Sequence, residues 1–305
     1  MSPKEINKRR IAIKVADAIN SIEGVPVSDY AVELSNQWAN GVITASQMKE
    51  MLLNVQEGIK MSKYDVYLYE NSNVLKNLLN IKDESALDLA EAELSRANMM
   101  ILYENGFCDF STNGICFIHK KLFGDIYEWA GKFRVINIQK REEILAGRSV
   151  WYANSDNIEK ELNEVWRRIN AIKWRILSKK KFVELISRHF AALWQIHPFR
   201  EGNTRTVSML MTFFVEHCGY YFDQDLIAQS AGYFRNALVM ASLDQFSEYE
   251  HLEKILGDAI CTEPVDYSES LYGCELTKKN KYEKYKVKDY KPSPHEYIDS
   301  NGDER

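Results

Sequence analysis

The most informative stretch of the chain is residues 195–206, which read QIHPFREGNTRT. The chain on either side of it is strongly apolar, with apolar residues at helical spacing, so each flank predicts a helix. Because Pro198 disfavours helical geometry at the residue before it, we expect the first helix to end at His197. Asn203 is a good N-cap residue and Gly202 permits a tight turn, so we expect the second helix to begin there.

This loop combines the residue types of an anion site with a base. A helix N-terminus presents free N–H groups and a partial positive charge, and a glycine turn lets them converge on phosphate oxygens. Arg205 adds a planar donor fork that suits phosphate. Glu201 fits beside a phosphate when Mg²⁺ lies between them, held by one carboxylate and the substrate phosphates. His197, the only histidine in this constellation, is placed to take a proton from a hydroxyl. Taken one at a time, each of these residues also has an ordinary structural explanation.

The composition is that of an ordinary globular protein. The 305 residues are 45% hydrophobic and 27% charged, and no apolar run reaches the roughly 18 residues that a membrane span needs. A net charge of −5 argues against a nucleic-acid surface. Five cysteines without a C-x-x-C pair fit a reducing compartment, so we expect a cytoplasmic protein without a membrane anchor.

Helical periodicity dominates the chain and predicts an all-α fold. The exception is a short β-hairpin near residues 134–152, where apolar arms flank a polar tip. Residues 61–80 stay unassigned. The helices are expected at 4–23, from Ser28, from Thr44 to about 60, and at 84–105, 111–123, 155–177, 181–196, 204–217, 224–229, 231–241 and 245–260.

Shifts in composition divide the chain into three parts. Residues 1–62 form a small helical unit, and residues 63–260 form the main domain that contains the loop. Residues 261–305 are polar and rich in lysine and tyrosine, so we expect a loosely ordered tail.

The order H-P-F-x-E-G-N-x-R in residues 197–205 resembles the motif of the Fic family of nucleotidyl transferases. Residues 122–134, LFGDIYEWAGKFR, are similar to the segment that precedes the target-binding hairpin of that family. The resemblance covers residues 81–260. It implies a helical Fic fold and the transfer of AMP from ATP to a Ser, Thr or Tyr hydroxyl of a protein, with residues 134–152 holding the target backbone.

Carried over by position, the resemblance implies that His197 is the general base and Glu201 the Mg²⁺ ligand. Gly202 and Asn203 then belong to the α-phosphate cradle, and Arg205 contacts the outer phosphates. Two positions depart from the family pattern. Thr204, within the nucleotide-binding set, stands where the family has Gly or Lys, and Ser208 stands where it has a second arginine for the γ-phosphate.

Residues 19–24, INSIEG, resemble the inhibitory motif S/T-x-x-x-E-G/N of Fic proteins and their antitoxins, except that Ile19 stands where the motif has Ser or Thr. The resemblance implies that Glu23, followed by Gly24, reaches the nucleotide site and competes with the γ-phosphate. Because Ser208 replaces the arginine that pairs with this glutamate, we expect Glu23 to lack a charged partner and to inhibit only partially. The alternative is that Glu23 and Gly24 simply end a helix.

Two other functions stay open from the sequence. The loop fits a nucleotide-binding regulatory module without transfer activity, because the phosphate clamp is incomplete at Ser208. It also fits Fic-type transfer of another phosphate-containing group. The expected partners are ATP and a protein with an exposed hydroxyl, with a homo-oligomer as a further option. Self-modification also stays open, and its candidate acceptors are Tyr267, Tyr272, Tyr282, Tyr285, Tyr290 and Tyr297.

Overall fold

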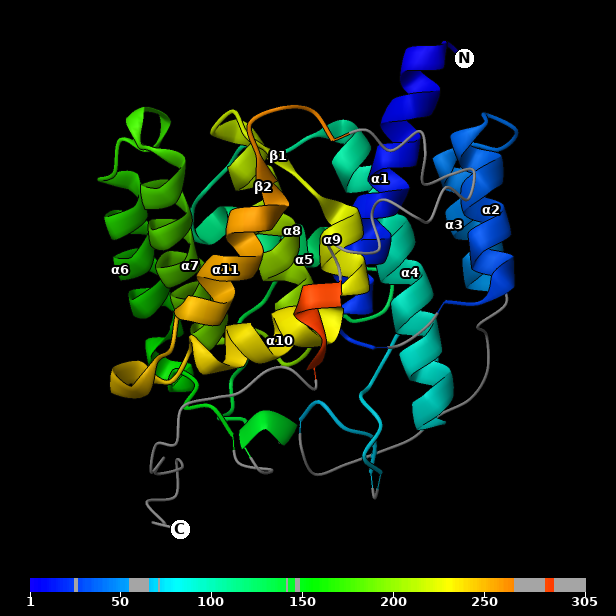
Figure 1. Cartoon of the computed structure of the whole chain (residues 1–305). Helices are drawn as coiled ribbons and strands as arrows, with labels where there is room; N and C mark the ends of the chain where they lie inside the picture. Colours follow the sequence, from blue (N-terminus) through cyan, green and yellow to red (C-terminus); the bar gives the residue numbers. More distant parts are fainter. Residues whose placement is uncertain are drawn as a thin grey trace.

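A computed structural model describes residues 1–24, 27–54, 66–70, 72–140, 142–145, 149–265 and 283–287. Helices dominate it (Figure 1). They are α1 (Pro3–Ser21), α2 (Asp29–Ala39), α3 (Ala45–Asn54), α4 (Glu84–Asn105), α5 (Thr112–Phe123), α6 (Ile158–Asn170), α7 (Lys179–Ile196), α8 (Asn203–His217), α9 (Gln224–Gln229), α10 (Ala231–Met240) and α11 (Glu250–Ala259). The predicted helical fold is confirmed.

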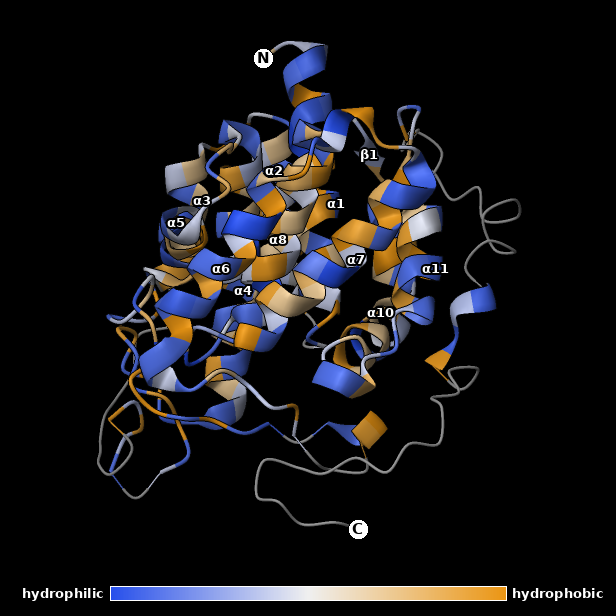
Figure 2. Cartoon of the chain, turned by 90° about the vertical axis from the view of Figure 1, so that its left-hand side faces the viewer, coloured by the Kyte–Doolittle hydropathy of each residue, from blue (hydrophilic) through white to orange (hydrophobic). Residues whose placement is uncertain are grey.

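Local capping explains where several helices begin. The side chain of Ser28 accepts a hydrogen bond from Ala31 N at the start of α2, as the sequence predicts. The side chain of Asp83 does the same for α4. Apolar periodicity then buries one face of each outer helix. In α6, whose hydrophilic and hydrophobic segments alternate in Figure 2, the buried residues are Ile158, Leu162, Val165, Trp166 and Ile169.

Helix α8 is the central helix of the bundle. Every residue from Asn203 to Val215 is buried, and α1, α5 and α7 pack against it. A helix that is covered on all sides holds its first turn rigidly, because no face of it is free to move into solvent. The loop at residues 197–202 therefore leads into a fixed helix N-terminus.

Helix α1 packs along α4 and α9 and also contacts α2, while α3 packs against α2 and α4 (Figure 1). Its alanine and valine residues belong to the same hydrophobic core as the helices of the main domain. The expected boundary at residues 62 and 63 lies outside the described residues, so the division into 1–62 and 63–260 stays a prediction.

The only two strands of the described residues lie outside the predicted hairpin. β1 (Tyr221–Phe222) pairs antiparallel with β2 (Ile260–Cys261). The described part of 134–152 has no strand and contains a single 3₁₀ turn at Glu143–Leu145. Its arms still lie close together, because Lys140 N donates to Ser149 Oγ over 3.1 Å. We call residues 134–153 the flap.

Arg134 explains why the arms of the flap do not pair as strands. Its guanidinium donates to the carbonyls of Ile136 and Ala153 on the two arms. Those carbonyls therefore bond to a side chain rather than to a facing strand. The hairpin prediction is wrong in its strand pairing, although the chain does turn back here.

Part of the expected loose tail is packed against the body of the protein. Tyr285 is 2% exposed and donates its hydroxyl to Asp258 Oδ2 over 2.7 Å, at the side of α11. The other tail tyrosines, which are candidate acceptors for self-modification, lie outside the described residues. None of the described helices is both long enough and apolar enough to cross a membrane.

Candidate active site

The loop between α7 and α8 is fixed by backbone geometry and by Arg134. Helix α7 ends at Ile196 as predicted, and His197 follows in the left-handed region with φ 49°. Arg134 Nε donates to the carbonyl oxygen of His197 over 2.8 Å, and Arg134 N donates to Pro198 O over 2.9 Å. The buried arginine thus joins the flap to the loop and holds the strained residue in place.

The imidazole of His197 is buried and neutral. Its Nδ1 lies 3.2 Å from the carbonyl oxygen of Trp194, and since a carbonyl only accepts, the ring hydrogen resides on Nδ1. Tyr152 stacks on the ring with centroids 4.0 Å apart. Among the described residues, Nε2 has no hydrogen-bond partner and keeps its lone pair free. Burial, followed by the charge of Lys140, holds the pKa of His197 well below its ordinary value.

Gly202 and Asn203 shape the turn into α8. Gly202 has φ +78°, and a Cβ there would lie 2.3 Å from the ring of Phe123, so only glycine fits. Asn203 is the first residue of the helix rather than its N-cap, which corrects the sequence-based expectation. Its side chain instead accepts from Phe199 N and donates to Phe199 O, both over 2.8 Å. This amide locks the loop into a closed turn.

The N-terminus of α8 is free of side-chain capping. Gly202 is the N-cap, and no side chain bonds to the first turn from that position. Thr204, where the family has Gly or Lys, directs its hydroxyl away from this turn and accepts from Trp194 Nε1 over 3.0 Å. The hydroxyl of Thr204 therefore does not cap the first turn of α8, and the substitution leaves that turn without a side-chain cap.

Glu201 is ionised and bonded to a lysine of the flap. Lys140 Nζ lies 2.9 Å from both carboxylate oxygens, and Gly202 N donates to Oε1 over 3.0 Å. Burial alone raises the pKa of Glu201, but Lys140 and the Gly202 N–H outweigh it and lower the pKa overall. The Glu201 carboxylate therefore already binds one cation, the ammonium group of Lys140.

Arg205 lies in a buried ion pair with helix α4. Its Nη2 pairs with Glu91, its Nη1 donates to Ser95 Oγ over 3.0 Å, and its guanidinium lies over the ring of Phe123. Burial lowers the pKa of Arg205, but the carboxylates of Glu91 and, next, Glu23 outweigh burial and raise it. The side chain therefore anchors α8 to α4, and its predicted contact with the outer phosphates stays a prediction.

Glu23 lies at the same site, at the turn that ends α1. Its Oε2 is 3.3 Å from Nη1 of Arg235 on α10, and its side chain is 17% exposed. Gly24 follows with φ +74°, a left-handed conformation that ends the helix. The expectation that Glu23 lacks a charged partner is wrong, because Arg235 supplies the cation that Ser208 does not.

Comparison with known proteins decides the family. A model of the Fic/DOC family matches residues 109–215. A probable protein adenylyltransferase of Sinorhizobium fredii, y4lH, is 32% identical over 162 residues, which are 52% of this chain and 80% of that protein. This chain belongs to the Fic/DOC family. It is a protein adenylyltransferase of the Fic type, and a model of the antitoxin VbhA matches its residues 9–54.

Two further comparisons agree with the Fic assignment. The protein adenylyltransferase VbhT of Bartonella schoenbuchensis is 30% identical over 195 residues, which cover 60% of this chain but only 40% of VbhT. The N-terminal Fic domain of a Bartonella quintana protein, solved with bound ADP, superimposes with a TM-score of 0.58 at 27% identity. That match covers 67% of this chain and 97% of the solved domain.

Sequence reasoning missed a second histidine in this Fic site. Gly131 N donates to Nδ1 of His119 over 2.8 Å, so Nε2 carries the hydrogen and donates to Glu201 O over 3.0 Å. The ring also stacks on Phe199 with centroids 3.8 Å apart. Burial lowers the pKa of His119 to about 3. His197 is therefore not the only histidine of the constellation, and only folding brings His119 to the loop.

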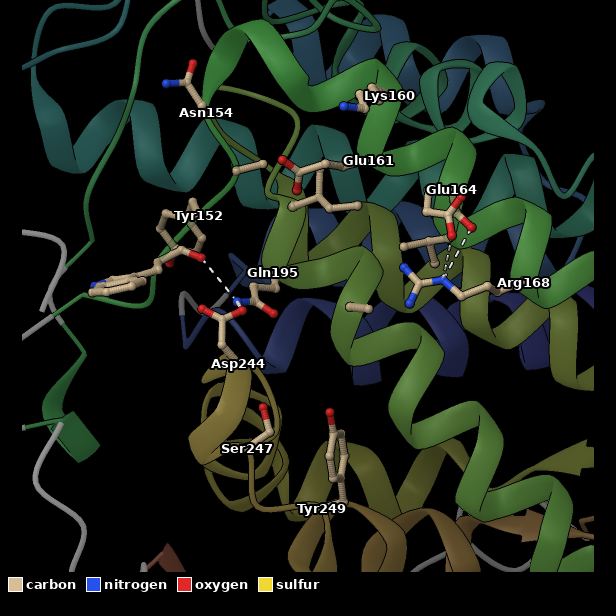
Figure 3. A pocket seen from close by; sticks show the side chains of 15 residues that line it. Tyr152, Asn154, Lys160, Glu161, Glu164, Arg168, Gln195, Asp244, Ser247 and Tyr249 are labelled. Atoms are coloured by element: carbon tan, nitrogen blue, oxygen red, sulfur yellow. Dashed lines mark hydrogen bonds and ion pairs between the residues drawn. The ribbon is translucent and has the colours of Figure 1, made fainter. Parts of the chain in front are cut away.

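A cavity of about 600 Å³ opens beside the C-terminal arm of the flap (Figure 3). Tyr152, Gln195 and Asp244 line one side of it, and Glu164 and Arg168 line the other. Gln195 Nε2 donates to Asp244 Oδ1 over 2.7 Å at its edge. None of the residues of the α8 N-terminus lines this cavity, so we do not assign the nucleotide to it.

Proposed function

We propose that this Fic protein transfers AMP from ATP to a Ser, Thr or Tyr hydroxyl of a protein, with His197 as the general base. One observation carries the proposal: the neutral imidazole of His197 keeps its Nε2 lone pair free beside the uncapped N-terminus of α8. A base with a lowered pKa stays unprotonated at neutral pH, and a free helix N-terminus binds phosphate.

In the proposed reaction the attacking hydroxyl gives its proton to Nε2 of His197. Its oxygen forms a bond to the α-phosphorus, the bond from that phosphorus to the bridging oxygen breaks, and pyrophosphate leaves. The hydrogen bond from Nδ1 to Trp194 O and the stack with Tyr152 hold the imidazole in the required tautomer and orientation.

The backbone of Gly202, Asn203 and Thr204 is proposed to form the α-phosphate cradle, in which the Gly202 N–H donates to Glu201 Oε1 in this structure. The N–H groups of the first turn of α8 are fixed in advance, because Asn203 locks the loop and the helix is buried. Fixed donors stabilise the charge that develops on the phosphorane without reorganising during the reaction. Arg205 acts on the outer phosphates in this proposal, with its guanidinium positioned by Glu91.

Glu201 fits a single-carboxylate Mg²⁺ site. No group of three or more His, Cys, Asp or Glu side chains that would suit a metal occurs among the described residues, so the nucleotide phosphates would complete the coordination. The anionic carboxylate already accepts the ammonium group of Lys140, which shows that it attracts a cation. When bound, Mg²⁺ would neutralise phosphate charge, and Lys140 would leave the carboxylate.

Glu23 is proposed to inhibit the enzyme from the antitoxin-like segment. Its carboxylate lies within electrostatic reach of Arg205, where the outer phosphates are expected, and the ion pair with Arg235 keeps it there. Because the pair between Glu23 and Arg235 is largely shielded from water, we expect stronger inhibition than the partial inhibition predicted from the lack of an arginine at Ser208. Glu23→Gly should therefore raise the transfer rate by about 10- to 100-fold.

The proposed setting is the cytoplasm, with ATP and a protein target as partners. The target backbone is proposed to lie along the flap, whose Val135 and Trp151 are 69% and 44% exposed. Self-modification and a homo-oligomer stay predictions. Tyr285 is a poor acceptor, because its hydroxyl is already bonded and its ring is buried.

Labelled ATP separates AMP transfer from the two other functions. Glu23→Gly protein is incubated with Mg²⁺, a lysate and ATP labelled in the α- or the γ-phosphate. AMP transfer leaves α-label but no γ-label on denatured protein. Retention of γ-label would indicate phosphoryl transfer, and loss of both labels on denaturation would indicate a nucleotide-binding module.

A further inference from the structure

Arg235 joins three parts of the protein that are far apart in sequence. It lies on α10, and its Nη1 and Nη2 face two different carboxylates. One is Glu23 of the antitoxin-like segment, at 3.3 Å, and the other is Glu142 of the flap, at 3.0 Å. The arginine side chain is 22% exposed, and that of Glu142 is 7% exposed. The guanidinium is thus held at the edge of the site between two acids.

Arg235 also belongs to the electrostatic environment of the reaction centre. Its charge contributes, after burial and Lys140, to the lowered pKa of His197. It also counteracts part of the rise that burial and Glu142 produce in the pKa of Tyr152, the residue stacked on His197. Both effects require that the guanidinium lies near the base.

Helix α8 provides no cation at the position where the family motif has its second arginine. Ser208 stands one turn after Arg205, is 5% exposed and carries only a hydroxyl. Arg205 bonds to Glu91 and Ser95 through its two Nη atoms, which leaves only its Nε without a partner among the described residues. If the Glu23 carboxylate lies where the terminal phosphate of ATP binds, then Arg235, which holds that carboxylate, lies within reach of the phosphate.

We propose that Arg235 takes the place of the missing arginine and binds the terminal phosphate of ATP after Glu23 has left. The inference rests on the proposed function, because it places the nucleotide at the N-terminus of α8. Glu142 is a positioning residue: it accepts from Nη2, so that Nη1 stays directed at the place that Glu23 occupies. A single cation from α10 then serves both the inhibited and the active state.

The test compares ATP with AMP in the full chain that carries Glu23→Gly. AMP binds the α-phosphate cradle but lacks the terminal phosphate. Its affinity therefore measures whether the fold and the cradle are intact, independently of any contact between Arg235 and the terminal phosphate. Adding Arg235→Gln should weaken ATP binding by about tenfold or more in calorimetry while AMP affinity changes by less than about twofold. Arg188→Gln, which removes an arginine of α7 that pairs with Glu253 of α11, is the matched control and should change neither affinity.

The inference is overturned if Arg235→Gln leaves ATP affinity unchanged, or if it lowers ATP and AMP affinity equally. The second result would show that the arginine supports the fold rather than the phosphate. If the Glu23→Gly protein binds neither nucleotide, the proposed function and this inference both fail. If it binds both and only the Arg235 result is negative, the proposed function stands without the inference.

Discussion

The ammonium nitrogen of Lys140 lies 2.9 Å from both carboxylate oxygens of Glu201. The pair joins the flap to the loop that precedes α8, and it places a protein cation where the proposed Mg²⁺ site lies. If Glu201 holds the proposed Mg²⁺, the metal and the lysine would compete for one carboxylate.

Lys140→Met should lower the Mg²⁺ concentration that gives half-maximal AMP transfer. The variant keeps a side chain of similar length and removes the competing charge. The measurement is a Mg²⁺ titration of transfer activity in the Glu23→Gly background. Lys132→Met, on the segment before the flap, serves as the control for a lost lysine. An unchanged or raised Mg²⁺ requirement in Lys140→Met would show that Glu201 does not receive the metal.

The buried pair between Arg205 and Glu91 should dominate stability near the site. Glu91→Gln leaves the guanidinium uncompensated in the core, which should lower the free energy of unfolding by about 3–5 kcal/mol. Denaturant unfolding measures this change. Glu184→Gln removes an exposed partner of Lys181 and should have little effect. Equal effects of the two variants would contradict the buried pairing.

The buried neutral histidines make stability depend on pH. Burial lowers the pKa of both His119 and His197, the former to about 3, whereas an unfolded histidine titrates near about 6.5. Below about pH 6.5 the unfolded chain binds more protons than the folded chain. The free energy of unfolding therefore decreases as the pH decreases, by up to about 1.4 kcal/mol per pH unit for each histidine. Unfolding of wild type and His119→Gln between pH 7 and 5 measures this slope. An identical slope in both proteins would show that His119 is not buried in its neutral form.

Moving the arginine back to its family position should restore nucleotide binding. In a protein with Glu23→Gly and Arg235→Gln, Ser208→Arg should recover about tenfold in ATP affinity, because a charged hydrogen bond to the terminal phosphate is regained. Ser208→Gln adds a long neutral side chain and should recover little. Equal recovery by the two variants would show that charge at this position is irrelevant.

Local signals in the sequence predict the helices and the loop because those signals act over a few residues. Ser28 caps the next helix through its own side chain, and Pro198 ends α7 at the residue before His197. The family motif likewise lies within one short stretch. These features need no knowledge of distant segments.

The partners of the site residues are not local, and spacing therefore does not reveal them. Glu23 and Arg235 are separated by 212 positions, Glu91 and Arg205 by 114, and Lys140 and Glu201 by 61. Each pair forms only when helices pack. The hairpin prediction failed for a related reason, because the side chain of Arg134 takes carbonyls on both arms that strands would have used.

The central claim is that His197 takes the proton in AMP transfer, and one rate comparison tests it most directly. The Glu23→Gly protein is compared with the Glu23→Gly, His197→Ala protein for transfer of α-labelled AMP to protein, at ATP concentrations that saturate both. We predict that the second variant binds ATP with similar affinity and transfers AMP about 100- to 10,000-fold more slowly, as expected for loss of a general base. Transfer at a similar rate in both proteins would contradict the account.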